Sequence, residues 1–263
     1  MNDALFNITY LDLVVCALLM LVPIIVSRAL RLMLETDLLI GTVRVFVQLI
    51  LVGHILHWVF GLDKPLPVLG LIVIMTIIAG YNAAKRAGLP QLPVILIATG
   101  VIGLTTLVVS AYVFYLIIGI TPYYNPAYVI PIVGMALNGA MNGVAVGARA
   151  LDRGIRDGRE RIEAALTVGA TYRQASIGIV RNALKQAMVP AINALMTAGI
   201  VQLPGMMTGQ IISGVDPVLA VRYQVVVFYM LTAVIALAVI AGTLILVRRY
   251  FTDAHQLRPL DSA

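Results

Sequence analysis

Seven long runs of apolar residues constrain this chain of 263 residues more than any other feature of its sequence. A helix needs roughly 20 apolar residues to cross the hydrocarbon core of a bilayer, where no water can satisfy its backbone N–H and C=O groups. Apolar residues make up 61% of the chain and charged residues 11%, against about 45–50% and about 25% in soluble domains. This balance disfavours both a soluble single-domain enzyme and a disordered chain.

We therefore predict an all-α, polytopic membrane protein with about seven transmembrane helices. The fourth apolar run is too long for one upright span, so we expect it to tilt, kink or project. We predict a single transmembrane domain over residues 1–263, with a mostly polar cytoplasmic loop at about 148–187. The predicted spans are 8–26, 38–60, 66–81, 92–120, 128–147, 188–213 and 224–247.

The basic residues between the apolar runs indicate the orientation of the chain. With the N-terminus outside, fifteen Lys and Arg residues fall on the inner side, and only Lys64 and Arg222 fall on the outer side. Arg44 lies within the second run. Because basic residues accumulate in cytoplasmic loops, we predict an N-terminus outside and a C-terminus in the cytoplasm of a bacterial cell, with the chain crossing the inner membrane several times.

The sequence lacks the common motifs of ATPases, zinc proteases and serine hydrolases. A phosphate-binding P-loop needs Gly-Lys followed by Ser or Thr, but Lys64, Lys85 and Lys185 follow Asp, Ala and Leu. No His-Glu-x-x-His or Gly-x-Ser-x-Gly motif is present, and the single cysteine, Cys16, excludes an intramolecular disulfide. The spans contain no deep carboxylate for a proton relay. We therefore predict no catalytic residues and no enzyme, but the movement of a substrate powered from elsewhere.

The cytoplasmic loop contains a short amphipathic pattern. Ile162, Leu166 and Gly169 fall on one helical face at i, i+4 and i+7, with arginines around them. Such an apolar ridge with a charged rim fits the groove of a partner protein, and an ordinary amphipathic linker helix is the alternative. Further along, Ile177 to Met188 repeat apolar residues at helical spacing, which predicts a helix along the inner interface.

Several polar or flexible residues inside the spans are candidates for a substrate pathway. Asn138 and Asn142 share one helical face, and holding helices together is the alternative role for them. Arg44 and Gln48 form a similar pair, for which the alternative is that Arg44 extends its charged end to the inner interface. Pro204 and Gly205 interrupt the sixth run, which predicts either a simple kink or a broken helix whose freed carbonyls line a cavity. The candidate pathway residues are Arg44, Gln48, Asn138, Asn142, Gln202, Pro204, Gly205, Met206 and Met207.

Metal ligands are sparse. His54 and His57 lie at i and i+3 near the outer end of the second run and are weak candidates for binding a divalent metal. The alternative is that the two histidines anchor the helix at the membrane interface beside Trp58. We favour this alternative because no carboxylate or thiolate lies nearby to complete a metal site. Met135, Met141, Met206 and Met207 could offer thioether ligands, but these suit Cu(I) more than iron, and flexible packing is the interpretation that we favour.

The loop also carries a motif. Glu163-Ala164-Ala165, followed after three intervening residues by Gly169, resembles the cytoplasmic motif of ABC-transporter permeases. In that motif a later Leu-Pro pair follows, where this chain has Arg181-Asn182. The resemblance implies a coupling helix that docks on an ATPase subunit. The implied ATPase-coupling residues are Glu163, Ala164, Ala165, Leu166, Gly169 and Ala170.

A longer stretch of sequence, within residues 201–217, resembles one particular family of permeases. The sequence VQLPGMMTG at 201–209, followed by GVDP at 214–217, resembles the family that contains the bacterial iron-export permease of the Fet type and the plant aluminium-tolerance permeases. This resemblance extends over roughly residues 38–247.

The resemblance implies a permease subunit of an ATP-driven ABC transporter that exports iron or a related metal by alternating access. It implies a permease homodimer and a separate ABC ATP-binding subunit, with ATP and Mg²⁺ on that partner and no cofactor bound by this chain. The lipid bilayer is a further expected partner, and nucleic acid is not. The alternatives are an ABC permease for an organic solute such as a sugar nucleotide, and a membrane interaction protein that transports nothing.

Overall fold

The computed structural model describes residues 9–62, 64–119, 121–122 and 124–259 of the chain. Every regular element in these ranges is a helix. The helices fall into two compact units, Met1–Asp63 and Lys64–Ala263, which we describe separately.

The N-terminal unit contains two long apolar helical segments. The first is continuous from α1 to α2, and Thr9 caps its start by a reciprocal pair of hydrogen bonds with Asp12. In the turn before α3, the buried Ser27 hydroxyl accepts a hydrogen bond from the Leu34 amide at 3.1 Å. The helices of this unit are α1 (Tyr10–Ala17), η1 (Leu18–Met20), α2 (Leu21–Ala29) and α3 (Glu35–Leu62).

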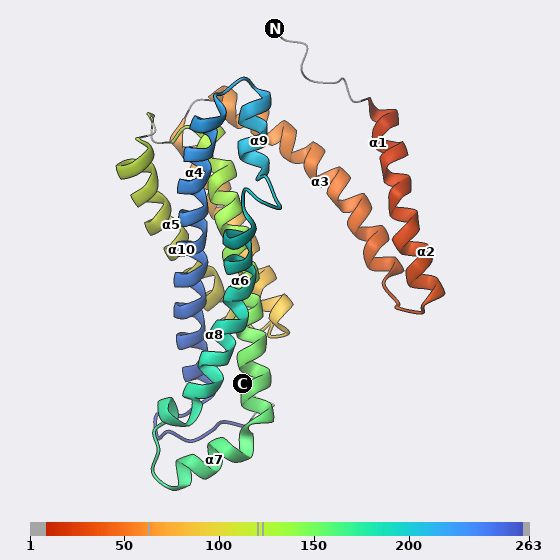
Figure 1. Ribbon diagram of the computed structural model, residues 1–263. Helices are drawn as coiled ribbons and strands as arrows, with labels where there is room; N and C mark the ends of the chain where they lie inside the picture. Colours follow the sequence, from red (N-terminus) through yellow and green to blue (C-terminus); the bar gives the residue numbers. More distant parts are fainter. Residues whose placement is uncertain (1–8, 63, 120, 123, 260–263) are drawn as a thin grey trace. The chain divides into compact units, whose positions relative to one another are not determined.

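The second unit is a helical bundle with α6 at its centre. α6 packs against α4, α8 and α10, and α5 packs against α4 and α10 (Figure 1). The helices of the bundle are α4 (Pro65–Ala87), α5 (Leu92–Tyr112), the π-helical η2 (Val113–Ile118), α6 (Pro126–Asp157), α7 (Arg159–Thr167), α8 (Tyr172–Thr197), α9 (Gly205–Ile212) and α10 (Pro217–Arg249).

Glycines allow the central helices to approach closely. A Cβ atom added at Gly143 would lie 2.8 Å from Val239 Cγ2 on α10, and one at Gly139 would lie 2.8 Å from Ile235 Cδ1. A Cβ atom at Gly80 on α4 would lie 2.6 Å from Thr99 Cα on α5. Helices in a bilayer associate largely through such close packing, because lipid is as apolar as the side chains.

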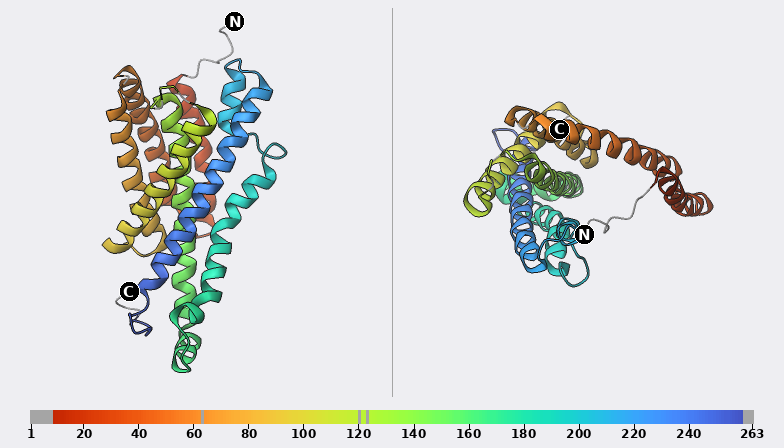
Figure 2. Two further views of the ribbon diagram at one scale, coloured as in Figure 1. Left: turned by 90° about the vertical axis from the view of Figure 1, so that its left-hand side faces the viewer. Right: turned by 90° about the horizontal axis from the view of Figure 1, so that it is seen from above.

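The end of the bundle that carries α7 has a hydrophobic core of its own. Leu151 and Ile155 on α6 are fully buried there, together with Ile162 on α7 and Val180 on α8. The chain after α10 folds back onto this core, where Phe251 and Tyr172 place their ring centroids 5.5 Å apart. Figure 2 shows α7 at the tip of the bundle, where it joins α6 to α8.

Six of the seven predicted spans are confirmed as helices long and apolar enough to cross a membrane. The fourth run does not continue as one regular α-helix, because α5 passes into the π-helical η2 at Val113. The sixth predicted span, at 188–213, is the one not confirmed, because it is divided between the end of α8 and the short α9.

The polar segment predicted at about 148–187 contains the two helices expected within it, at α7 and in the first half of α8, and α6 also extends into it as far as Asp157. All of it is helical except residues 158 and 168–171. The polar stretch forms helices because each has one apolar face: Leu151 and Ile155 on α6 pack with Val180 and Ala183 on α8. The segment from Ile177 to Met188 is accordingly part of α8, which packs on α6, where we expected a helix lying along the membrane surface.

Candidate functional site

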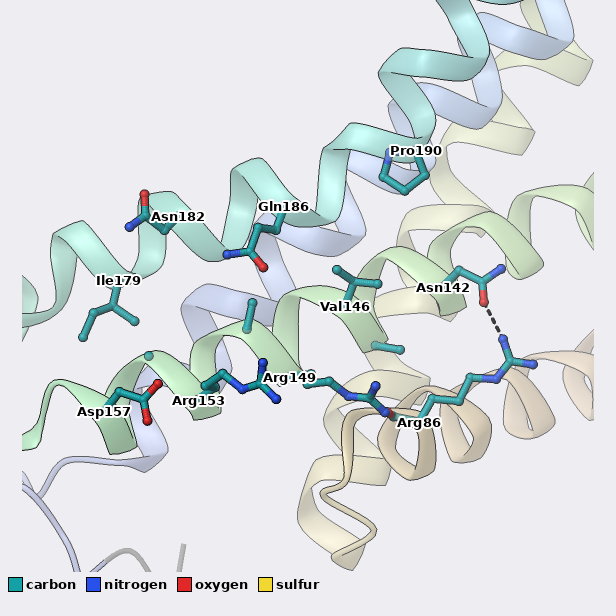
Figure 3. A pocket seen from close by; sticks show the side chains of 13 residues that line it. Arg86, Asn142, Val146, Arg149, Arg153, Asp157, Ile179, Asn182, Gln186 and Pro190 are labelled. Carbon is teal, nitrogen blue, oxygen red and sulfur yellow. Dashed lines mark hydrogen bonds between the residues drawn. The ribbon is translucent and has the colours of Figure 1, made fainter. Parts of the chain in front are cut away.

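A cleft of about 910 Å³ opens between α4, α6 and α8, on the half of the bundle nearest α7 (Figure 3). We call it the arginine cleft, because three arginines from two helices line it. Its lining consists of Arg86, Asn142, Ala145, Val146, Arg149, Ala150, Arg153, Gly154, Asp157, Ile179, Asn182, Gln186 and Pro190.

The first two arginines of the cleft are held by neighbouring groups. Arg86, at the end of α4, donates from Nη1 to Asn142 Oδ1 at 2.5 Å. Asn142 donates in turn to Asn138 Oδ1 at 3.4 Å. Arg149 donates from Nη2 to the backbone carbonyl of Arg86. These contacts join α4 to α6 and place two guanidinium groups at the same edge of the cleft.

Arg153 and Asp157 complete the charged lining. Within the part of the chain that the structure describes, neither side chain has a hydrogen-bond or ion-pair partner. Asp157 is the one carboxylate of the lining, against three arginines. Across the cleft, α8 contributes the neutral amides of Asn182 and Gln186. The arrangement therefore favours an anion over a cation.

Two other predicted pathway residues lie on the N-terminal unit. Arg44 and Gln48 share one face of α3, as their spacing predicts, and line a shallow apolar groove of about 510 Å³ within that unit. Most of the groove is aliphatic side chain, including Ile40 and Val43.

The remaining pathway candidates surround the break between α8 and α9. The Thr197 carbonyl accepts a hydrogen bond from the Val201 amide at 3.0 Å, and Gly199 adopts a φ of +79° in the turn. The helix restarts only after Pro204, with Gly205 as its first residue. The structure thus has a broken helix here, and the simple kink is wrong. Met206 is partly buried in α9, Met207 is buried, and Gln202 is exposed.

The predicted apolar ridge on α7 faces the protein instead of a partner. Ile162 is only 1% exposed and Leu166 packs against the core, so both anchor α7 to its own bundle. Gly169 is not part of a ridge: its φ of +90° ends the helix in the left-handed conformation that glycine favours. The correction follows from burial, because helical spacing defines a face but not the direction in which it points.

The outward side of the α7 segment combines small or apolar residues with charged ones. Ala164 is exposed, and Val168 is 84% exposed at the tip of the turn. Glu163 pairs with Arg159 on the same helix, with Oε1 and Nε 2.8 Å apart. Ala165 and Ala170 are half-buried and are joined by a backbone hydrogen bond of 3.1 Å.

A long-range polar contact fixes the end of α10 to α6. Tyr250 donates from its hydroxyl to Asp152 Oδ1 at 2.8 Å. Burial raises the pKa of Tyr250 above its ordinary value, and the hydrogen bond to Asp152 raises this pKa further. The hydroxyl therefore stays protonated and holds the two helices together next to α7.

The histidine pair offers little to a metal. His54 Nδ1 lies 2.8 Å from the Ile50 carbonyl of its own helix, and both His54 and His57 are exposed. Among the residues that the structure describes, no three His, Cys, Asp or Glu side chains come together. Met141 and Met207 are buried, as packing residues are.

Sequence reasoning missed most of the arginine cleft. Arg149 and Arg153 lie at i and i+4, and Asn142 and Asn138 continue the same face of α6. This spacing was a signal for one polar helical face, but the expectation of a loop after residue 147 concealed it. Arg86 was counted only as an inner-side charge, because nothing local links it to a residue 63 positions away.

The comparisons with known proteins agree with the resemblance. Residues 10–251 match the model of the uncharacterised protein family UPF0014. The chain is 32% identical to the probable iron export permease protein FetB of Escherichia coli (strain K12), over 95% of each chain. It is 31% identical to the protein ALUMINUM SENSITIVE 3 of Arabidopsis thaliana, over 90% of this chain and 86% of that one.

The membrane protein YjkA of Bacillus subtilis (strain 168) is 30% identical, over 95% of this chain and 98% of its own length. No solved structure matches the chain. With six helices able to span a bilayer, the chain is a multi-pass protein of the bacterial inner membrane. It belongs to the UPF0014 family and is a membrane permease subunit of the ABC type, not itself an enzyme.

Proposed function

We propose that two copies of this chain pair with two copies of a separate ATP-binding subunit and export iron or a related metal. The proposal of iron as substrate rests on the similarity to FetB, which is named a probable iron export permease. ATP and Mg²⁺ bind to the partner, since this chain carries no Gly-Lys-Ser/Thr motif. On this proposal α7 faces the cytoplasm, as the distribution of basic residues predicts.

The observation that supports coupling is the way in which α7 is anchored. Ile162 places α7 in a core shared by α4, α5, α6, α8 and α10. Because closely packed interiors transmit strain, a displacement of α7 passes directly to these helices. The exposed side of the segment, around Ala164 and Val168, is then the surface left for the partner.

These contacts support transport by alternating access. ATP binding closes the partner dimer and pushes on α7, and α6 and α8 move because both are joined to it. The glycine strip of α6, at Gly139, Gly143 and Gly147, gives α10 a smooth surface along which α6 can slide. The pathway candidates at the break before α9 lie at the opposite end of the bundle from α7 (Figure 1).

Docking is tested by Val168→Trp, with Val201→Trp as the matched control. The two valines are 84% and 80% exposed, and they lie at opposite ends of α8, so each change adds the same bulk to an exposed turn. We expect Val168→Trp to reduce co-purification of the ATP-binding subunit at least roughly ten-fold, because a bulky residue at a packed contact prevents close approach. Val201→Trp should leave co-purification unchanged. Equal yields from both variants would contradict docking at α7.

The substrate is tested by flux in sealed vesicles that contain the chain and its ATP-binding subunit. We expect ATP-dependent iron transport, with other divalent metals as comparison. ATPase stimulation by a sugar nucleotide without metal flux would indicate the organic-solute permease instead. A membrane interaction protein would show neither flux nor a nucleotide-dependent change in the accessibility of its helices.

A further inference from the structure

We infer that the arginine cleft is a binding site for a phosphate-bearing anion, held by Arg86, Arg149 and Arg153. The site goes beyond the proposed export of iron, because it depends only on the cleft and not on the cargo. The phosphate group of an anionic lipid and that of a water-soluble compound present the same chemistry to these side chains.

The charge of the lining selects an anion. Three guanidinium groups from α4 and α6 meet one carboxylate, that of Asp157, and no ion pair within the described part of the chain neutralises Arg86, Arg149 or Arg153. A bare metal cation would be repelled here. No His or Cys lines the cleft to offset that repulsion.

The donors of the cleft suit a tetrahedral phosphate. A guanidinium group presents its N–H donors in a planar fork that binds two phosphate oxygens at once, and such charge-assisted bonds are stronger than neutral ones. The amides of Asn182 and Gln186 on α8 lie across the cleft and can donate to the remaining oxygens (Figure 3). A phosphate group between them would bridge α6 and α8.

The cleft is also partly preorganised. The Asn142 side chain accepts from Arg86, and the Arg86 carbonyl accepts from Arg149, so these two cations are oriented before any ligand arrives. Within the described part of the chain, Arg153 has no partner, so its full set of donors remains available. Preorganised donors lower the entropic cost of binding.

The placement of the cleft gives binding a structural consequence. Its two main walls, α6 and α8, are the helices that α7 joins. A bridging phosphate therefore restricts the relative motion of the two helices that hold α7. We expect slower hydrogen exchange in residues 145–157 and 179–190 when the probe is bound.

The experiment uses the full-length chain in nanodiscs of neutral phosphatidylcholine, with pyrophosphate as the soluble probe in calorimetry. Arg149→Gln with Arg153→Gln removes two charges at i and i+4 on α6. The matched control, Arg181→Gln with Lys185→Gln, removes two charges at i and i+4 on α8, outside the cleft. We expect the first double variant to weaken binding at least roughly ten-fold and the control less than about two-fold, because only the first removes charge-assisted bonds.

A second arm identifies the source of the phosphate. The same variants are purified from mixed phosphatidylglycerol and phosphatidylcholine, and retained lipid is counted by native mass spectrometry. Selective loss of phosphatidylglycerol from the Arg149/Arg153 variant indicates a lipid headgroup, and selective loss of pyrophosphate binding indicates a soluble compound. Wild-type protein that binds neither probe, or equal losses in both double variants, would overturn the inference.

A further variant guards against misfolding. Asn182→Asp with Gln186→Glu keeps the shape of the cleft but adds two negative charges opposite the arginines. It should abolish binding of both probes while the protein retains its unfolding temperature, and binding that survives would count against the site. All of these measurements omit the ATP-binding subunit and iron, so a failure here is distinguishable from a failure of the proposed export.

Discussion

α3 and α6 are both long apolar helices, yet they are packed very differently. Of the 28 residues of α3 only Val59 is buried, whereas half of the 32 residues of α6 are buried. α3 has large apolar residues spread over most of its surface, while α6 places small residues such as Ala140 and Gly143 inward and Arg149 and Asn142 outward. High hydropathy therefore identifies a helix as membrane-compatible, and the distribution of small and polar residues indicates whether it packs within its own unit.

The largest expected difference between the two helices is in the stability lost when a leucine is replaced by alanine. Leu151 on α6 is 0% exposed and Leu49 on α3 is 66% exposed. Leu151→Ala should lower the free energy of unfolding by about 2–5 kcal/mol, because it leaves a cavity in the core. Leu49→Ala should change it by less than about 0.5 kcal/mol. Unfolding of each variant in detergent measures both values, and a cost at Leu49 as large as that at Leu151 would remove the distinction between the helices.

Replacing a glycine by alanine adds a Cβ atom and so tests how tightly each helix is packed. A Cβ atom at Gly80 would overlap Thr99, with its Cα 2.6 Å away, whereas one at Gly53 on α3 meets nothing within 4 Å. Gly80→Ala should cost about 1–3 kcal/mol through overpacking. Gly53→Ala should stabilise its helix by up to about 1 kcal/mol, since alanine has the higher helix propensity. Thermal unfolding of the two variants should shift in opposite directions, and a shared direction would contradict this.

The smallest effect concerns a single hydrogen bond in the bundle. Tyr250→Phe removes the bond to Asp152 and should cost about 1 kcal/mol at neutral pH. Tyr115→Phe is the control, because its side chain is 81% exposed.

The pKa of Tyr250 adds a pH dependence to the same variant. Since this pKa is raised on folding, the contribution of Tyr250 is complete below the ordinary tyrosine pKa of about 10 and is lost as the pH rises above it. Between pH 8 and 11 the free energy of unfolding, measured by denaturation at each pH, should therefore decrease less steeply for Tyr250→Phe than for wild type. Identical slopes would show that Tyr250 ionises as freely in the folded protein as in the unfolded one.

The helices could be predicted because their cause is local. Each apolar run must satisfy its backbone within itself once it enters hydrocarbon, so length and hydropathy predicted six of the spans closely. The break after Thr197 could likewise be suspected from Pro204 and Gly205. Polar residues beyond the spans carry no such constraint, so the continuation of α6 through 148–157 was not predicted. The helix at 177–188 was predicted from its apolar spacing, but its packing on α6 was not.

Contacts between distant residues depended on the tertiary structure. Local spacing placed Ile162 and Leu166 on one face of a helix, but only the position of the core turned that face inward. The arginine cleft required the end of α4 to meet the middle of α6, which brings Arg86 to Arg149. Periodicity describes one helix at a time, whereas a site between helices exists only once their relative positions are known.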